Sequence, residues 1–228
     1  MIKFLLGAYW DARPDRLEKC TEDAGRFFAG LAEIDPLLAQ WYERGRSRKD
    51  ALTRQVDTSD AQKLQDLLLK GRNRRDVGHE VIDELGFSLS LWNGAREEEA
   101  EASVGVYCGA YSERVGNNVL IDLPYQSEGL KWVENASSLL ALVAEIWRPK
   151  WAGIMSKKAM RERDFDGDYP FVDWMVYVPR SIASVPAPGR VELLSGLGSI
   201  VIVQPDPPVG GGGEESSRIR QVESLLAA

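Results

Sequence analysis

Apolar residues recur along the chain with two different periods, and each period predicts one kind of element. After Pro14, the apolar positions from Leu17 to Ile34 are spaced by three or four, which is typical of a helix with one buried face. Between residues 87 and 123, apolar positions alternate with other residues in three runs, which is typical of strands. We therefore expect a helix that ends at Asp35-Pro36 and a three-stranded antiparallel meander over 87–123.

Several other segments fit the same patterns. Further strands are predicted over residues 2–10, 174–179, 191–194 and 199–203, and residues 38–43 fit either a short strand or a turn of helix. Further helices are predicted to follow Ser59 or Asp60, to follow Asp76, and to begin at Asn135 or Ser137. Because strands and helices are segregated along the chain, we predict an α+β fold, a single domain in which helices pack on a mainly antiparallel sheet.

The C-terminal end of the chain differs in composition from the rest. Residues 205–213 read PDPPVGGGG, which is typical of an extended or flexible linker. Apolar residues then recur with helical spacing from Ile219 to Leu226. We therefore expect an α+β domain over 1–204, a linker over 205–217 and an amphipathic tail helix over 218–228.

The segment LLLKGRNRRDV, residues 67–77, places three arginines within four positions, with Lys70 just before them. Gly71 is placed to end one helix in the left-handed conformation, and Asp76 is placed to cap the next. This predicts a helix–helix connector, in which Lys70 and Arg72 suit the carboxyl end of the first helix. Arg74 and Arg75 have no such role, so we expect them to pair with acidic residues of this fold or of a partner.

Composition and charge narrow the classes of function. The net charge of −7 opposes a general nucleic-acid role and favours a basic partner or simple solubility. No run of 18 apolar residues is present, and the N-terminus does not fit a signal peptide, so we expect no membrane contact. Cys20 and Cys108 fit small buried apolar positions, which suits a reducing compartment such as the cytoplasm.

Few residues carry the chemistry of catalysis or of metal binding. His79 is the sole histidine and is expected early in a helix, exposed to solvent. Asp164, Asp166 and Asp168 alternate as at the start of a calcium loop, but the glycine falls one place early and Met175 stands where the final Glu is needed. A solvated acidic loop is the preferred interpretation, and no metal or other cofactor is expected.

Acidic and aromatic residues are the more prominent features. Glu97, Glu98, Glu99 and Glu101 lie between two predicted strands and fit either a solvated loop or a contact for a basic partner. Trp92 and Trp174, with Tyr107 and Tyr111, are expected on the sheet face opposite the aliphatic residues. That face either packs on helices or presents aromatic anchors to a partner.

Several segments in the same order resemble a known family. They are YWDARPDRLEKC, LAEIDPLLAQWYERGRSRKDAL, GRNRRD, ELGFSLSLWNG, CGAYSERVGNNVLIDLP, WRPKWAGIMS, DWMVYVPR and GRVELLSGLGSIVIVQ. From about Tyr9 to about Gln204 the chain resembles the bacterial polymorphic-toxin immunity proteins of immunity family 52. The resemblance implies an α+β fold and a cognate toxin, typically a nuclease of restriction-endonuclease fold that is often delivered by type VI secretion or a contact-dependent system.

The resemblance carries no agreed set of binding residues, so the expected site rests on charge and exposure. We expect a non-enzymatic protein that occludes the active site or substrate groove of its toxin, or that binds away from the active site and blocks a motion or a dimer. The partner-binding residues that we predict are Glu97, Glu98, Glu99, Glu101, Asp164, Asp166, Asp168, Arg74, Arg75 and Trp92.

Two other classes remain open from the sequence. One is a small hydrolase or accessory enzyme that uses His79 or the Asp164–Asp168 loop. The other is a nucleic-acid binder that uses the basic residues between 44 and 75.

Overall fold

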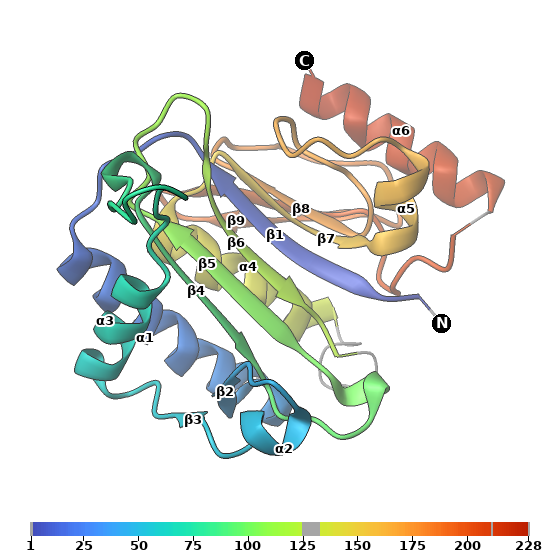
Figure 1. Ribbon diagram of the computed structural model, residues 1–228. Helices are drawn as coiled ribbons and strands as arrows, with labels where there is room; N and C mark the ends of the chain where they lie inside the picture. The colour runs from blue at the N-terminus through green and yellow to red at the C-terminus, as the bar shows by residue number, and fades with distance from the viewer. Residues whose placement is uncertain (1, 125–132, 211, 228) are drawn as a thin grey trace. The chain divides into compact units, whose positions relative to one another are not determined.

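A computed structural model describes residues 2–124, 133–210 and 212–227 (Figure 1). The chain forms two compact units. We call Trp10–Ile121 the continuous unit, and we call Met1–Tyr9 together with Asp122–Ala228 the split unit. Each unit is built on antiparallel strands with helices packed on them, so the predicted α+β class is confirmed. No helix among the described residues has the length and apolar character needed to cross a membrane.

The continuous unit holds the predicted meander. Its strand order is β3 (Gln55–Val56), β2 (Trp41–Glu43), β4 (Phe87–Trp92), β5 (Ser103–Cys108) and β6 (Asn117–Asp122), with Asp122 itself in the split unit. The register of β4 on β5 pairs Leu89 with Val106 and Ser90 with Gly105. All the aliphatic residues of these two strands therefore lie on one face, as the alternation predicts.

Two main helices support this sheet. Helix α1 (Leu17–Ile34) buries the predicted stripe, including Cys20, Phe27 and Leu31, and ends where Asp35 takes extended geometry. Helix α3 (Ala61–Lys70) contacts both α1 and β4, and the Asp60 side chain caps it by accepting from Gln62 and Lys63 backbone N–H groups. A short helix, α2 (Arg48–Ala51), and a 3₁₀ turn, η1 (Pro36–Leu38), complete the connections, so residues 36–43 hold both a helical turn and a strand.

The split unit has a second set of strands. Their order is β1 (Phe4–Trp10), β7 (Trp151–Ser156), β8 (Met175–Val178), β10 (Gly198–Ile202) and β9 (Arg190–Leu194), with Trp10 itself in the continuous unit. Helix α4 (Val133–Trp147) contacts β7, β8 and β10. Helices α5 (Lys157–Glu162) and α6 (Gly213–Ala227) complete this unit. Ile219 and Val222 of α6 join the buried cluster around Trp151, Val176 and Val201.

The helix predicted after Asp76 is wrong. Residues 74–81 instead reverse direction in a tight turn, with a bridge between Arg74 and Val81 and a hydrogen bond from Arg75 N–H to the Glu80 carbonyl at 2.9 Å. Gly78 and His79 both have positive φ, of 83° and 53°, which a helix cannot accommodate. Only the short 3₁₀ turn η2 (Asp83–Leu85) follows, and His79 is therefore not a helix residue.

Other predicted boundaries also shift. Gly71 does end α3, but with φ of −79° rather than in the left-handed conformation. Its role is steric, because a Cβ there would lie 1.8 Å from the Ser88 carbonyl oxygen. Helix α4 begins at Val133, before the predicted Asn135 or Ser137, and α6 begins at Gly213, inside the predicted linker. Strand β7 was not predicted, because all six of its residues are buried and its sequence shows no alternation.

Candidate partner-binding site

The acidic segment 97–101 forms an ordered loop between β4 and β5. Glu98–Ala100 is the 3₁₀ turn η3, and the side chain of Asn93 ties the two ends of the loop together. Its amide nitrogen donates to the Ala100 carbonyl at 2.8 Å and to the Leu37 carbonyl at 3.1 Å. Its oxygen accepts from the Ala102 N–H at 2.9 Å. These three hydrogen bonds of the Asn93 side chain therefore hold the loop that carries the carboxylates in a fixed path.

The carboxylates of this loop face solvent. Glu97, Glu98 and Glu101 are exposed, and Glu99 is half-buried. Arg96 lies 3.9 Å from Glu97, both are largely exposed, and such a surface pair contributes little stability. Glu99 and Glu101 form no ion pair with any residue that the structure describes. Glu99 and Glu101 therefore present negative charge that no described residue neutralises.

Trp92 ends β4 beside this loop. It pairs across the ladder with Tyr42 of β2, and the two ring centroids lie 6.4 Å apart at an interplanar angle of 55°. The structure thus brings one predicted aromatic residue next to the acidic loop, Glu97 to Glu101. Trp174 does not join them, since it is buried in the split unit and donates its indole N–H to the Gln204 carbonyl.

Arg74 and Arg75 lie at the other end of β4. Their turn follows α3 at Gly71, which abuts Ser88 near the start of the strand, whereas the acidic loop follows Trp92 at its end. Both arginines are exposed, and Arg74 donates to the His79 carbonyl at 3.1 Å. A six-residue strand is roughly 20 Å long. The arginines and the acidic loop therefore cannot form one contact point, although both belong to the continuous unit.

Asp164, Asp166 and Asp168 lie in the split unit, on the loop between α5 and β8. All three are exposed, and Asp166 Oδ1 accepts from the Asp168 backbone N–H at 3.0 Å. The loop is anchored by Trp151, whose indole N–H donates to the Gly167 carbonyl at 3.0 Å. No group of three His, Cys, Asp or Glu side chains within the described ranges is arranged to hold a metal ion.

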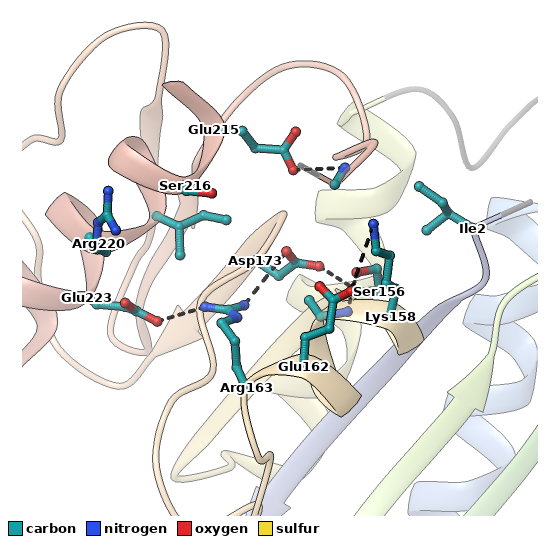
Figure 2. Close-up of a pocket in the computed structure, with 13 residues that line it drawn as sticks. Ile2, Ser156, Lys158, Glu162, Arg163, Asp173, Glu215, Ser216, Arg220 and Glu223 are labelled. Atoms are coloured by element: carbon teal, nitrogen blue, oxygen red, sulfur yellow. Dashed lines mark hydrogen bonds and ion pairs between the residues drawn. The ribbon is translucent and has the colours of Figure 1, made fainter. Parts of the chain in front are cut away.

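A hollow of about 270 Å³ also lies in the split unit, lined by α5, α6 and the Gly210 loop (Figure 2). Its centre is Arg163, which donates to Glu223 of α6 at 2.9 Å and to the Val172 carbonyl at 2.6 Å. Its guanidinium carbon also lies 4.0 Å from the centroid of the Phe171 ring. Arg163 therefore fastens α6 to the loop before β8.

Asp173 lies at the floor of this hollow and is 3% exposed. The Ser156 backbone N–H donates to its Oδ2 at 2.6 Å, and Arg163 Nη2 lies 3.8 Å from its Oδ1 (Figure 2). Burial raises the pKa of Asp173, and the hydrogen bonds from Ser156 and the charge of Arg163 offset this only in part. Sequence patterns gave no signal for this group, because its partners lie 17 and 10 residues away along the chain.

The side chains that could act as nucleophiles or bases are poorly placed for catalysis. His79 lies on an exposed turn. Cys20 and Cys108 are each 2% exposed, as the sequence predicts. A hydrogen bond with Cys20 and burial both raise the pKa of the Cys108 thiol, so this sulfur is held protonated. The strongest features of the surface are therefore its charged loops and exposed aromatic rings, which are the features of a protein that binds another molecule.

Comparison with known proteins identifies the family. The family model described as Immunity protein 52 matches residues 3–209, so the chain belongs to this family. Members are generally non-enzymatic, and an immunity protein implies a cognate toxin as its partner. A search of curated proteins finds no match. The match reaches Val209 and so excludes α6.

A solved structure confirms the fold at low sequence identity. The chain is similar to the Pseudomonas aeruginosa T6SS protein PA0821, with a TM-score of 0.56 and 11% identity. The similarity covers 100% of this chain and 76% of that protein. At this identity the similarity concerns the fold alone.

Proposed function

We propose that this protein binds and neutralises a cognate bacterial toxin, a nuclease effector, by occluding its active site or substrate groove. The observation that carries the proposal is the family match over residues 3–209. The resemblance of the sequence to partners of restriction-endonuclease-fold toxins supports the choice of a nuclease. The fold similarity to a T6SS protein supports delivery of that toxin by type VI secretion. The protein then acts in the cytoplasm of the producing cell.

Charge supports occlusion over remote inhibition. A nuclease must present a positive surface to the phosphates of its substrate. The net charge of −7 steers this protein toward such a surface, and Glu97, Glu98 and Glu99 offer carboxylates in place of phosphates. Asp164, Asp166 and Asp168 offer a second exposed acidic loop in the split unit. Arg74 and Arg75 are proposed to contact acidic groups of the toxin.

Reversing the charge of the acidic loop tests this mechanism. The variant Glu97→Lys/Glu98→Lys/Glu99→Lys should associate with an inactivated toxin about tenfold more slowly at low salt, and the difference should shrink at high salt. A matched control reverses three exposed glutamates of α1, at Glu18, Glu22 and Glu33. Surface plasmon resonance with the product of the neighbouring gene measures both. Equal association rates for the two variants would show that the loop does not steer the complex.

A further inference from the structure

One face of the sheet in the continuous unit has no helix of that unit packed on it. Helix α3 bonds Glu43 through Lys63 and Lys70, and Phe28 of α1 packs on Trp41 of β2. Both contacts lie on the face that carries Leu89, Leu91, Val104 and Val106, all of which are buried. The strand register places a different set on the opposite face. This set, which we call the open face, is Tyr42, Ser88, Ser90, Trp92, Ser103, Gly105 and Tyr107. Every one of these residues is half-buried or exposed.

The open face consists of aromatic rings separated by very small side chains. Tyr42 and Trp92 lie at one end, and Tyr107, which is 43% exposed, lies opposite Ser88 at the other. Ser90 and Gly105 pair with each other between the two ends. The centre of the face therefore carries only the small side chain of Ser90 opposite Gly105, and no large side chain there hinders the approach of a partner.

Two glycines allow the tyrosine rings to lie along the sheet. A Cβ on Gly105 would come within 3.2 Å of the Tyr107 ring. A Cβ on Gly94 would come within 2.5 Å of the Tyr42 ring. Each ring thus covers a glycine, and Tyr107 is 43% exposed. A ring held in this way is suited to stack on a planar cation.

The acidic loop lies at the Tyr42 end of the open face. It leaves β4 directly after Trp92, and Asn93 fixes its path. A guanidinium group stacked on Tyr42 or Trp92 would therefore lie at the end of the sheet from which the acidic loop, with its exposed Glu97 and Glu98, extends. An aromatic face with acidic residues at its edge suits a polypeptide that carries arginine. The plane of the guanidinium group stacks on aromatic rings, and its N–H groups donate to carboxylates.

Nucleic acid is an alternative occupant of the open face, because its bases also stack on aromatic side chains. Arg48 reaches the same corner, where its Nη2 donates to the Gly94 carbonyl at 3.3 Å. The carboxylates of the acidic loop would repel phosphates, so the observations favour a polypeptide.

We infer that the open face is the surface that receives an arginine-bearing segment of the toxin, with Tyr42, Trp92 and Tyr107 as stacking platforms and Glu97–Glu99 as counter-charges. This inference rests on the proposed function and gives it a binding surface. It also predicts that this arginine-bearing segment lies along β2, β4 and β5, apart from the contact proposed for Arg74 and Arg75 at the other end of β4.

The first test uses a labelled hexa-arginine peptide and fluorescence anisotropy. Ser90→Lys fills the centre of the open face and adds a positive charge, and Tyr107→Ala removes one platform without changing the charge. Their matched controls are Ser224→Lys on an exposed position of α6 and Tyr169→Ala on the split unit, where Tyr169 is 75% exposed. We expect both open-face variants to bind about tenfold more weakly than their controls. Circular dichroism confirms that all four variants are folded.

The possible outcomes distinguish a failure of the proposed binding surface from a failure of the proposed function. Equal peptide affinities across open-face variants and controls would overturn the inference. Binding of a labelled oligo-dT strand to the open face, without binding of the peptide, would overturn it in favour of nucleic acid. In a second arm, inactivated toxin that binds wild type and Ser90→Lys equally would show that the toxin uses another surface, while the proposed function stands. Toxin that binds neither wild type nor the controls would refute the proposed function, and the peptide result would still decide the chemistry of the face.

Discussion

At the scale of single residues, Glu43 shows how charge joins a strand to a helix. It ends β2 and accepts from Lys63 at 2.9 Å and from Lys70 at 2.5 Å, both on α3. The hydrogen bond from Lys70, with that from Lys63, holds the pKa of Glu43 below its ordinary value in spite of partial burial. The lysines are the more exposed partners, so solvent screens much of this interaction.

Glu43→Gln should lower the free energy of unfolding by about 1 kcal/mol at neutral pH. The folded-state pKa is lowered, so the contribution is present above the unfolded pKa and is lost as the pH falls through the folded value. Urea denaturation at neutral pH and at about pH 3 measures this difference. Glu113→Gln, at an exposed position, is the control and should change little. A Glu43 effect that persists unchanged in acid would contradict the assignment.

The pKa of Asp173 is shifted in the opposite direction to that of Glu43. Its pKa is raised by burial, so ionisation disfavours the folded state, and stability is lost as the pH rises from the unfolded value through the folded one. Asp173→Asn can still accept the Ser156 N–H bond but cannot ionise, so its unfolding free energy should vary less with pH over this interval. Denaturation at several pH values compares it with Asp206→Asn, an exposed control. Parallel pH profiles for wild type and Asp173→Asn would show that Asp173 does not titrate as described.

At the scale of elements, the junction of α3 with β4 depends on close backbone contact. Gly71 leaves no room for a Cβ, and the Ser88 hydroxyl donates to the Gly71 carbonyl at 2.7 Å. Gly71→Ala should therefore destabilise the protein by about 2 kcal/mol or more, because strand or helix must shift. Gly213→Ala, at the open start of α6, meets nothing within 4 Å and should be neutral or slightly stabilising. Thermal melts that rank the two variants equally would contradict this steric account.

The helices and strands also show which sequence patterns are sufficient to predict an element. The stripe of α1 and the alternation of β4 to β6 are local patterns with one buried face, and both were predicted correctly. The spacing of Val77, Val81, Ile82 and Leu85 imitates a helix, but Gly78 and His79 adopt positive φ within it. Strand β7 is buried on both faces, so its sequence does not alternate between apolar and polar residues and gives no strand period.

At the scale of the whole molecule, the predicted site residues fall in two units and at both ends of β4. The acidic loops could be predicted from the sequence, because clusters of Glu and Asp are read directly from it and such clusters are usually exposed. The open face depends on strand register and on Gly94 and Gly105, which bring Tyr42 and Tyr107 onto one surface with Trp92. Tyr42 lies 50 residues from Trp92 along the chain, so no local pattern could join them.

The central claim is that this protein neutralises a toxin by binding it directly. The most direct measurement is a titration of the purified toxin encoded beside it, with DNA cleavage as the readout and complex formation followed by size-exclusion chromatography. We expect cleavage to fall in proportion to added protein and to reach zero when the two are present in the ratio found in the isolated complex. Full cleavage at excess protein, with no complex on the column, would contradict the claim.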